Sequence, residues 1–271
     1  MEIREVQIVQ AMVKSKLPDC DYVINPYIGC AHSCAYCYAK FMKRFTGHQE
    51  EWGKFIDVKT NIVWALKNQL ERPARTKYFE KGMVFLSSVT DPYQSLEDKY
   101  RLTRSCLELL AKYDWPVSVL SKSSLIKRDI DVFKKFSDIE VGLSIGVLND
   151  GIARLFETTS NKVSERVKAL HEVKRNGIKT YLFIAPVLPF LTDLESTFKF
   201  FQGKVDKICV ETLNTDSVNW KGVREVLAAH FPDLLPKYEY IFFTKKRDAY
   251  LEDLSREVSA FGKKYKVKTV F

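Results

Sequence analysis

Three cysteines lie close together near the start of the chain, at Cys30, Cys34 and Cys37. Three thiolates at this spacing can converge on one metal centre if the loop between them wraps around it. A structural zinc site or a fully ligated iron–sulfur site has four protein ligands, and a fourth local thiol is missing here. The spacing therefore predicts a metal centre that keeps one coordination position open for a small molecule, which is typical of reactive rather than structural sites.

Two other residues offer a fourth ligand. His32 lies between the cysteines and would complete a structural zinc site, as expected for a basic nucleic-acid-binding protein with a zinc-stabilised loop. Cys20 would supply a fourth sulfur, but it precedes the first predicted strand, and we expect it to point away from the loop.

Short apolar runs rich in β-formers alternate with amphipathic helical patterns along most of the chain. Strands are predicted over 22–28, 83–89, 117–120, 141–147, 180–187 and 207–213, and helices include 103–113, 125–136 and 163–176. Such alternation implies parallel strands joined by crossover helices. The length suits six βα units and not eight, since a closed eight-unit barrel needs about 250 residues. We expect an α/β protein with a partial (βα)6 TIM-like barrel.

The rest of the chain is assigned around this barrel. Residues 1–21 are expected to be an N-terminal extension, 22–213 the barrel, and 214–271 a C-terminal helical extension that packs on it. The extension contains helical patterns over 223–229 and 247–261 and a final extended piece, 266–271.

Composition narrows the class of protein. Hydrophobic residues make up 46% of the 271 residues, and no apolar run reaches the roughly 18 residues that would span a membrane. The first 17 residues mix charged and apolar types and lack a secretory signal, so we expect a cytoplasmic protein without a membrane partner. Lys and Arg exceed Asp and Glu by 43 to 34, and a net charge of +9 favours polyanions such as DNA or RNA. The alternative is that these cations simply cover solvated helix faces.

The cysteine spacing, with Tyr36 before the third cysteine, resembles the signature of the radical S-adenosylmethionine (radical SAM) superfamily. Later motifs, in order, are similar to the spore photoproduct lyase-like branch of that superfamily. They are SVTDPYQ at 88–94, SKS at 121–123, FET at 156–158, SER at 164–166, NG at 176–177 and PVLP at 186–189.

The resemblance implies a chemistry. A 4Fe-4S cluster on Cys30, Cys34 and Cys37 would bind S-adenosylmethionine at its open iron. An electron from an external donor of the flavodoxin or ferredoxin type would then break a C–S bond and release a 5′-deoxyadenosyl radical, which abstracts a substrate hydrogen. The cofactors supply this chemistry, and the protein positions them.

The resemblance also implies cofactor contacts. Tyr36 would lie near the adenine, although simple packing is its alternative role. Ser88, Thr90, Asp91, Lys122 and Ser144 would lie at the carboxyl ends of strands and contact the methionine carboxylate, ribose or amino group. Lys122 could equally be a solvated loop residue. Glu157 and Arg166 are expected either to touch ligand or to form an ion pair that orders their loop.

The chain departs from the lyases in one respect. They carry a cysteine just before the Thr-x-Asp turn, whereas the segment 85–91 has serine there. A serine O–H donates a hydrogen atom far less readily than a thiol, so spore photoproduct lyase activity is not expected and the substrate stays unidentified, with nucleic acid as a candidate. Strand alternation places Lys207, Cys209 and Glu211 on one face. If that face is the barrel interior, Cys209 is a candidate catalytic hydrogen donor or acceptor; otherwise it only packs.

Overall fold

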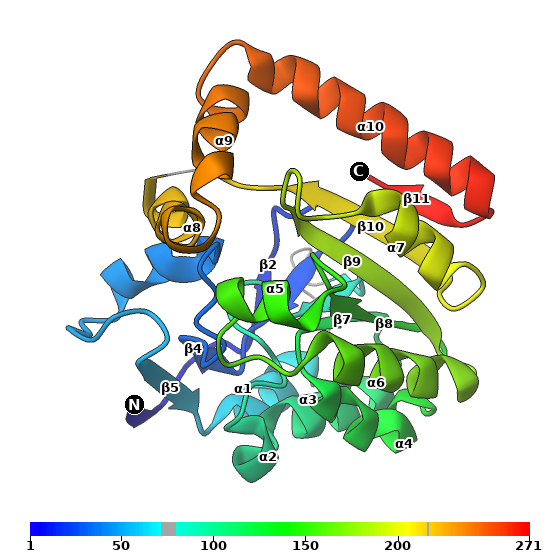
Figure 1. The fold of residues 1–271 in the computed structure, drawn as a ribbon. Helices are drawn as coiled ribbons and strands as arrows, with labels where there is room; N and C mark the ends of the chain where they lie inside the picture. The colour runs from blue at the N-terminus through cyan, green and yellow to red at the C-terminus, as the bar shows by residue number, and fades with distance from the viewer. Residues whose placement is uncertain (72–79, 216) are drawn as a thin grey trace.

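The computed structural model describes residues 1–71, 80–215 and 217–271. Its main feature is a curved eight-stranded sheet in the order β11-β10-β9-β8-β7-β6-β3-β2 (Figure 1). Every neighbouring pair is parallel except β2 and β3, which are antiparallel. The strands are β2 (Met12–Lys14), β3 (Tyr22–Ile24), β6 (Val84–Leu86), β7 (Val117–Ser121), β8 (Ile139–Ser144), β9 (Lys179–Val187), β10 (Lys207–Thr212) and β11 (Lys268–Val270).

The two faces of the sheet differ in polarity. On β10, Ile208 and Val210 are buried, and they belong to a large apolar core with residues of the covering helices. Lys207, Cys209 and Glu211 alternate with them and point to the concave face. The covering helices are α1 (Ile62–Leu70), α3 (Leu102–Lys112), α4 (Ile130–Phe133), α6 (Val163–Arg175) and α7 (Leu194–Phe201).

This architecture confirms the predicted partial barrel. All six predicted strands are present, and the sheet ends at β2 and β11 without closing. Two predicted elements are each divided in the structure. The run 22–28 divides into β3 and β4 (Tyr27–Ile28) because Asn25-Pro26 interrupts it, and proline cannot donate to a ladder. The helical pattern 125–136 forms η2 (Ser124–Asp129) followed by α4.

A second, three-stranded sheet lies beside the barrel. It has the order β1-β5-β4 and contains β1 (Glu2–Val6) and β5 (Phe55–Lys59). β1 has no alternating apolar pattern that would have predicted it, because four of its five side chains are exposed. The small sheet supports the cysteine-containing loop that leaves β4.

The C-terminal segment arches over one end of the barrel (Figure 1). It consists of α8 (Ser217–His230), η3 (Pro232–Leu234), α9 (Leu235–Phe242), α10 (Lys246–Tyr265) and β11. α8 lies against the cysteine loop so closely that a Cβ on Gly222 would be 2.4 Å from the carbonyl oxygen of Ala35. In the described ranges, no helix has the length and apolar character that crossing a membrane requires.

Candidate active site

The cysteine loop begins with a turn that only glycine fits. Gly29 has a φ of +85°, and a Cβ there would lie 2.4 Å from the carbonyl oxygen of Phe55 on β5. This turn brings Cys30 and Cys34 into buried positions and leaves Cys37 partly exposed. The loop then continues into η1 (Tyr38–Phe45).

The three thiols influence one another. Burial raises the pKa of each of them, and the charge of Cys37 raises the pKa of both Cys30 and Cys34 further. Thiols with raised pKa values stay protonated at neutral pH, so a bound cation must compensate the charge when they become thiolates. Two backbone N–H groups, that of His32 in the loop and that of Asp91 after β6, lower the pKa of Cys30 and so offset part of this shift.

Further donors surround the sulfurs. The indole N–H of Trp52 is buried and lies beside Cys37, whose pKa it lowers. The Lys122 ammonium lowers the pKa values of Cys34 and Cys37. A thiolate or an inorganic sulfide would accept from these groups, so the residues fit an iron–sulfur cluster. Over 1–71, 80–215 and 217–271, no three His, Cys, Asp or Glu side chains are grouped as ligands of a metal ion. A cubane cluster does not need such a group, because each of its thiolate ligands binds a different iron.

Asp91 fastens the cysteine loop to the sheet. Its Oδ2 lies 3.2 Å from Nε2 of His32 and accepts from the backbone N–H of Lys122 at 2.7 Å, while Oδ1 accepts from Oγ of Ser121 at 2.6 Å. Burial alone raises the pKa of Asp91, but His32 and these donors outweigh it and bring the pKa to about 2. Both oxygens are therefore occupied by the protein, and the His32 ring faces Asp91.

Lys122 and Ser144 meet at the carboxyl ends of β7 and β8. Nζ of Lys122 donates to Oγ of Ser144 at 2.6 Å and lies 5.5 Å from the ring centre of Tyr36. Ser144 in turn donates to the carbonyl oxygen of Ala185 on β9. The structure thus brings together three of the predicted cofactor-binding residues, next to Cys34.

A buried ion pair lies behind this group. Arg166 donates to the Glu157 carboxylate, which also accepts from the hydroxyl of Tyr36. A second guanidinium nitrogen of Arg166 donates to the carbonyl oxygen of Ser144 at 2.8 Å. Of the two alternatives that the sequence left open, the ion pair is present. It connects α6 to both Tyr36 and Ser144.

Ser88 and Thr90 fasten the loop after β6. Thr90 donates to the carbonyl oxygen of Gly29 at 2.5 Å, and the backbone N–H of Ser88 donates to Oδ1 of Asn25 at 3.0 Å. Sequence reasoning missed Asn25 as a site residue, because it lies inside the predicted strand 22–28; the signal was its position directly before Pro26, which interrupts a strand. Cys20, by contrast, lies away from the trio and contacts Oγ of Ser15 at 3.2 Å.

Cys209 shares a face with Ser144. Both residues pair with Phe183 in the parallel register, so they lie in one row of the concave face, two strands or roughly 10 Å apart. Burial raises the pKa of the Cys209 thiol to about 11, although Lys207 opposes the shift. One row further from the carboxyl ends, Nζ of Lys207 lies 2.8 Å from Oε2 of Glu140. The concave face is therefore polar and carries a protonated thiol.

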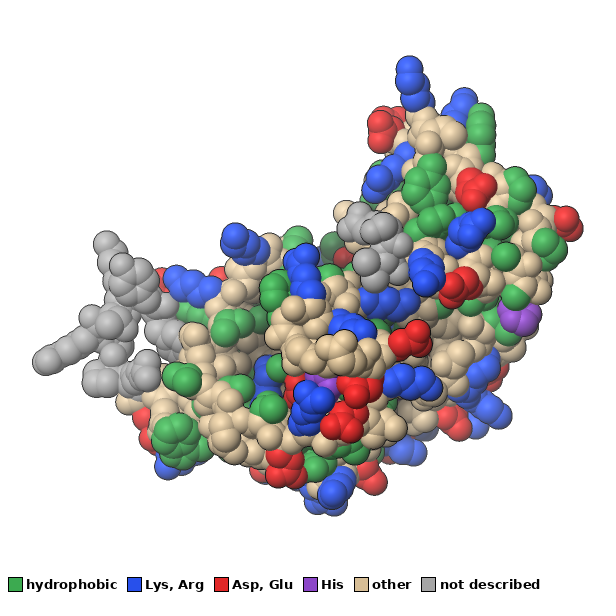
Figure 2. Space-filling view, turned by 90° about the vertical axis from the view of Figure 1, so that its left-hand side faces the viewer, with side chains coloured by type: hydrophobic (Ala, Val, Ile, Leu, Met, Phe, Trp, Pro, Cys, Tyr) green, Lys and Arg blue, Asp and Glu red, His purple; other side chains and the backbone are tan. Residues whose placement is uncertain are grey.

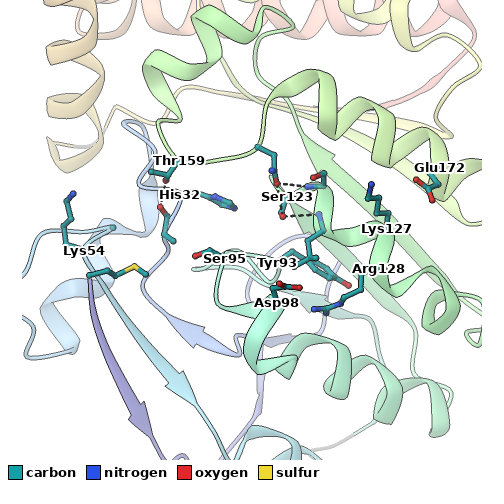
Figure 3. Close-up of a pocket in the computed structure, with 16 residues that line it drawn as sticks. His32, Lys54, Tyr93, Ser95, Asp98, Ser123, Lys127, Arg128, Thr159 and Glu172 are labelled. Atoms are coloured by element: carbon teal, nitrogen blue, oxygen red, sulfur yellow. Dashed lines mark hydrogen bonds between the residues drawn. The ribbon is translucent and has the colours of Figure 1, made fainter.

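A cavity of about 900 Å³ adjoins the cysteine loop on another side. His32, Tyr93 and Ser123 line it, with Lys54 and Lys127 at its rim, as Figure 3 shows. Neither the three cysteines nor Lys122, Ser144 or Cys209 line this cavity. Asp98 and Glu172 offset the charges of Lys54 and Lys127, and the third cation of the lining, Arg128, forms ion pairs with Glu97 and Asp129.

Comparison with known proteins decides the family. Residues 24–201, which include the cysteine loop and the strands through β9, match the model of the Radical SAM superfamily. The chain belongs to the radical SAM superfamily. It is an enzyme of a superfamily that uses S-adenosylmethionine and an iron–sulfur cluster for radical chemistry.

Relatives share much of the chain. An uncharacterized protein of Methanocaldococcus jannaschii is 38% identical over 195 residues, which cover 72% of this chain and 71% of the relative. A radical SAM Nα-GlyT isomerase of Pseudomonas phage M6 is 28% identical over 168 residues, or 61% of this chain and 33% of the relative.

Solved structures confirm the radical SAM fold. Spore photoproduct lyase with a dinucleoside spore photoproduct superposes with a TM-score of 0.62 at 16% identity, over 83% of this chain and 65% of the lyase. Streptococcus suis SuiB bound to its precursor peptide SuiA superposes with a TM-score of 0.52 at 15% identity, over 80% and 46% of the two chains. This radical SAM chain thus spans about two thirds of the length of the lyase.

Proposed function

We propose that the protein holds a 4Fe-4S cluster on Cys30, Cys34 and Cys37 and reductively cleaves S-adenosylmethionine to a 5′-deoxyadenosyl radical. The single observation that carries the proposal is the meeting of three thiols, two of them buried, with the buried indole N–H of Trp52 and the Lys122 ammonium at one loop. When bound, the cluster supplies the electron that opens the sulfonium. The remaining steps belong to the protein's own side chains.

Those side chains form two groups: some would contact the cofactor, and others hold the loops in place. Tyr36, Lys122 and Ser144 line the carboxyl ends of the strands beside Cys34, where they would hold the cofactor. Lys122 offers its ammonium to a carboxylate, and the Tyr36 ring offers a flat apolar face to the adenine. Ser88, Thr90 and Asp91 hold the loops in place; their polar groups already have protein partners. We therefore assign them to positioning.

The substrate would bind along the concave face. Cys209 lies there with its thiol protonated, so we propose it as the residue that gives a hydrogen atom to a substrate radical and is left as a thiyl radical. A nucleic acid is the substrate class we favour, because the chain carries a net charge of +9 and spore photoproduct lyase, a structural neighbour, was solved with a dinucleoside photoproduct. A cytoplasmic location would keep the thiols reduced.

Anaerobic reconstitution tests the proposal. We expect a brown protein with about four irons per chain, as one cubane requires, and 5′-deoxyadenosine when dithionite and S-adenosylmethionine are added. Cys30→Ala should lose the iron and the cleavage together, while Cys106→Ala, a cysteine in the helical core, should keep both. One zinc per chain, or a Cys30→Ala protein that still cleaves S-adenosylmethionine, would contradict the assignment.

A further inference from the structure

The η1 segment that follows the third cysteine carries exposed aromatic rings, one exposed cation, Arg44, and two half-buried lysines. We call Lys40, Phe41, Lys43, Arg44 and Phe45 the η1 surface. Phe45 is 66% exposed and Phe41 38%, and the Arg44 guanidinium carbon lies 4.7 Å from the Phe45 ring centre and 5.6 Å from that of Phe41. No acidic residue occurs within η1. Figure 2 faces the side on which η1 lies and shows cationic, acidic and hydrophobic side chains interspersed on it.

The η1 surface is joined to the cysteine loop by the chain itself and by hydrogen bonds. η1 begins at the residue after Cys37, and the backbone N–H of Lys40 donates to the carbonyl oxygen of Cys37 at 3.5 Å. Nζ of Lys40 also donates to the carbonyl oxygen of Ala35, between Cys34 and Cys37, at 2.7 Å. Phe41 therefore stands one helical turn from a cluster ligand.

We propose that the η1 surface docks an acidic electron-carrier protein; this inference rests on the proposed function. The step is the transfer of one electron: the reduced carrier is oxidised, the cluster is reduced, and no atom or proton moves. A small apolar centre surrounded by cations fits the transient, sub-1,200 Å² encounters of redox partners, and opposite charge accelerates them. The acids nearest in sequence, Glu50 and Glu51, lie outside η1, and Glu50 contacts His48.

A nucleic acid would also be attracted to cations and aromatic rings. Two features favour the carrier. The η1 surface adjoins Cys37, a proposed cluster ligand, and an electron must enter at the cluster. Its cations also lie on one short segment, whereas Cys209, where we propose that the substrate binds, lies on β10. The test below treats the nucleic acid as a competing outcome.

The decisive variants reverse charge or remove an exposed ring. We would compare Arg44→Glu and Phe45→Ser with Lys263→Glu and Phe271→Ser, which change an exposed cation and an exposed ring at the other end of the chain. Calorimetry at low salt measures binding of oxidised flavodoxin and ferredoxin to each protein. S-adenosylmethionine cleavage is then driven either by the reduced carriers or by dithionite.

We expect the two η1 variants to bind the carrier at least tenfold more weakly and to lose carrier-driven cleavage in proportion. Dithionite-driven cleavage should be unchanged, because a small reductant needs no docking surface, and both control variants should match the wild type. Equal carrier binding by wild type and variants, no carrier binding by the wild type, or selective loss of oligonucleotide binding would overturn the inference. Failure of dithionite to drive cleavage in the wild type would instead reject the proposed function. Calorimetry would still measure carrier binding in that case, so the two failures can be told apart.

Discussion

Arg166 is the largest of the fully buried side chains in the described part of the radical SAM chain, and its hydrogen bonds join several segments around the site. Its guanidinium reaches the Glu157 carboxylate, the carbonyl oxygen of Ser144 and Oγ of Ser160. Through Glu157 it also fixes the hydroxyl of Tyr36. One residue on an outer helix thereby holds two candidate cofactor contacts on different elements, so we assign it a positioning role.

Removing this guanidinium should cost both stability and cofactor affinity. Arg166→Met leaves the Glu157 carboxylate buried without its cation, and breaking a buried pair in this way destabilises proteins by about 3–5 kcal/mol. Urea denaturation measures the free energy of unfolding, and calorimetry measures affinity for S-adenosylmethionine. Lys168→Met, on the exposed side of the same helix, should stay within about 0.5 kcal/mol of wild type. An Arg166→Met protein as stable as this control would contradict the positioning role of Arg166.

The Cys209 thiol gives a prediction about pH. Because burial raises its pKa to about 11, only about a thousandth of the thiol is ionised at pH 8. Its alkylation by iodoacetamide, followed peptide by peptide with mass spectrometry, should therefore become about tenfold faster per pH unit between pH 8 and 10. A rate that levels off near pH 9 would show an ordinary thiol and weaken its assignment as a hydrogen-atom donor.

At the scale of elements, the C-terminal helices and the cysteine loop depend on each other. α8 lies against the loop at Gly222, and an apolar cluster that includes Val223, Leu227 and Tyr238 joins these helices to residues after β8 and β9. The helices therefore form one wall of the candidate site. This contact explains why a glycine occupies the middle of α8, where it is otherwise unfavourable.

A single methyl group tests that contact. Gly222→Ala would stabilise an isolated helix by about 1 kcal/mol, but here its Cβ would lie 2.4 Å from the backbone oxygen of Ala35. We expect the variant to be less stable than wild type in thermal denaturation and to retain less iron after reconstitution. Ala229→Gly, at an exposed position of α8, reports the helix preference alone. An increase in stability for Gly222→Ala would mean that the helix does not press on the loop.

At the scale of the whole molecule, net charge and the open sheet bear on the nucleic-acid substrate that we propose. The chain has 43 Lys and Arg against 34 Asp and Glu. The barrel stays open between β2 and β11, so the polar concave face, with Cys209 and Glu211, is not closed off by further strands in the described sheet. A nucleic acid segment can reach such a face without threading through a closed ring.

Binding of this kind must weaken with salt. Fluorescence anisotropy with a labelled oligonucleotide should show log K falling linearly with log salt concentration, since each neutralised phosphate releases counterions. Contacts to four phosphates of a single strand would give a slope of about −3. A protein that shows no binding at 50 mM salt, or an affinity that does not depend on salt, would direct the search toward peptides and small molecules.

The sequence by itself determined what lies within one loop or one period: the three cysteines, the alternation of strands and helices, the open barrel and the shared face of Lys207, Cys209 and Glu211. These features are local, because side-chain spacing sets secondary structure and loop ligands directly. Only the tertiary structure joined His32 to Asp91, Lys122 to Ser144 and Arg166 to Tyr36 through Glu157, and placed β1 beside β5. Those pairs depend on strand order and register, and each joins segments whose separation along the chain leaves no periodic trace in the sequence.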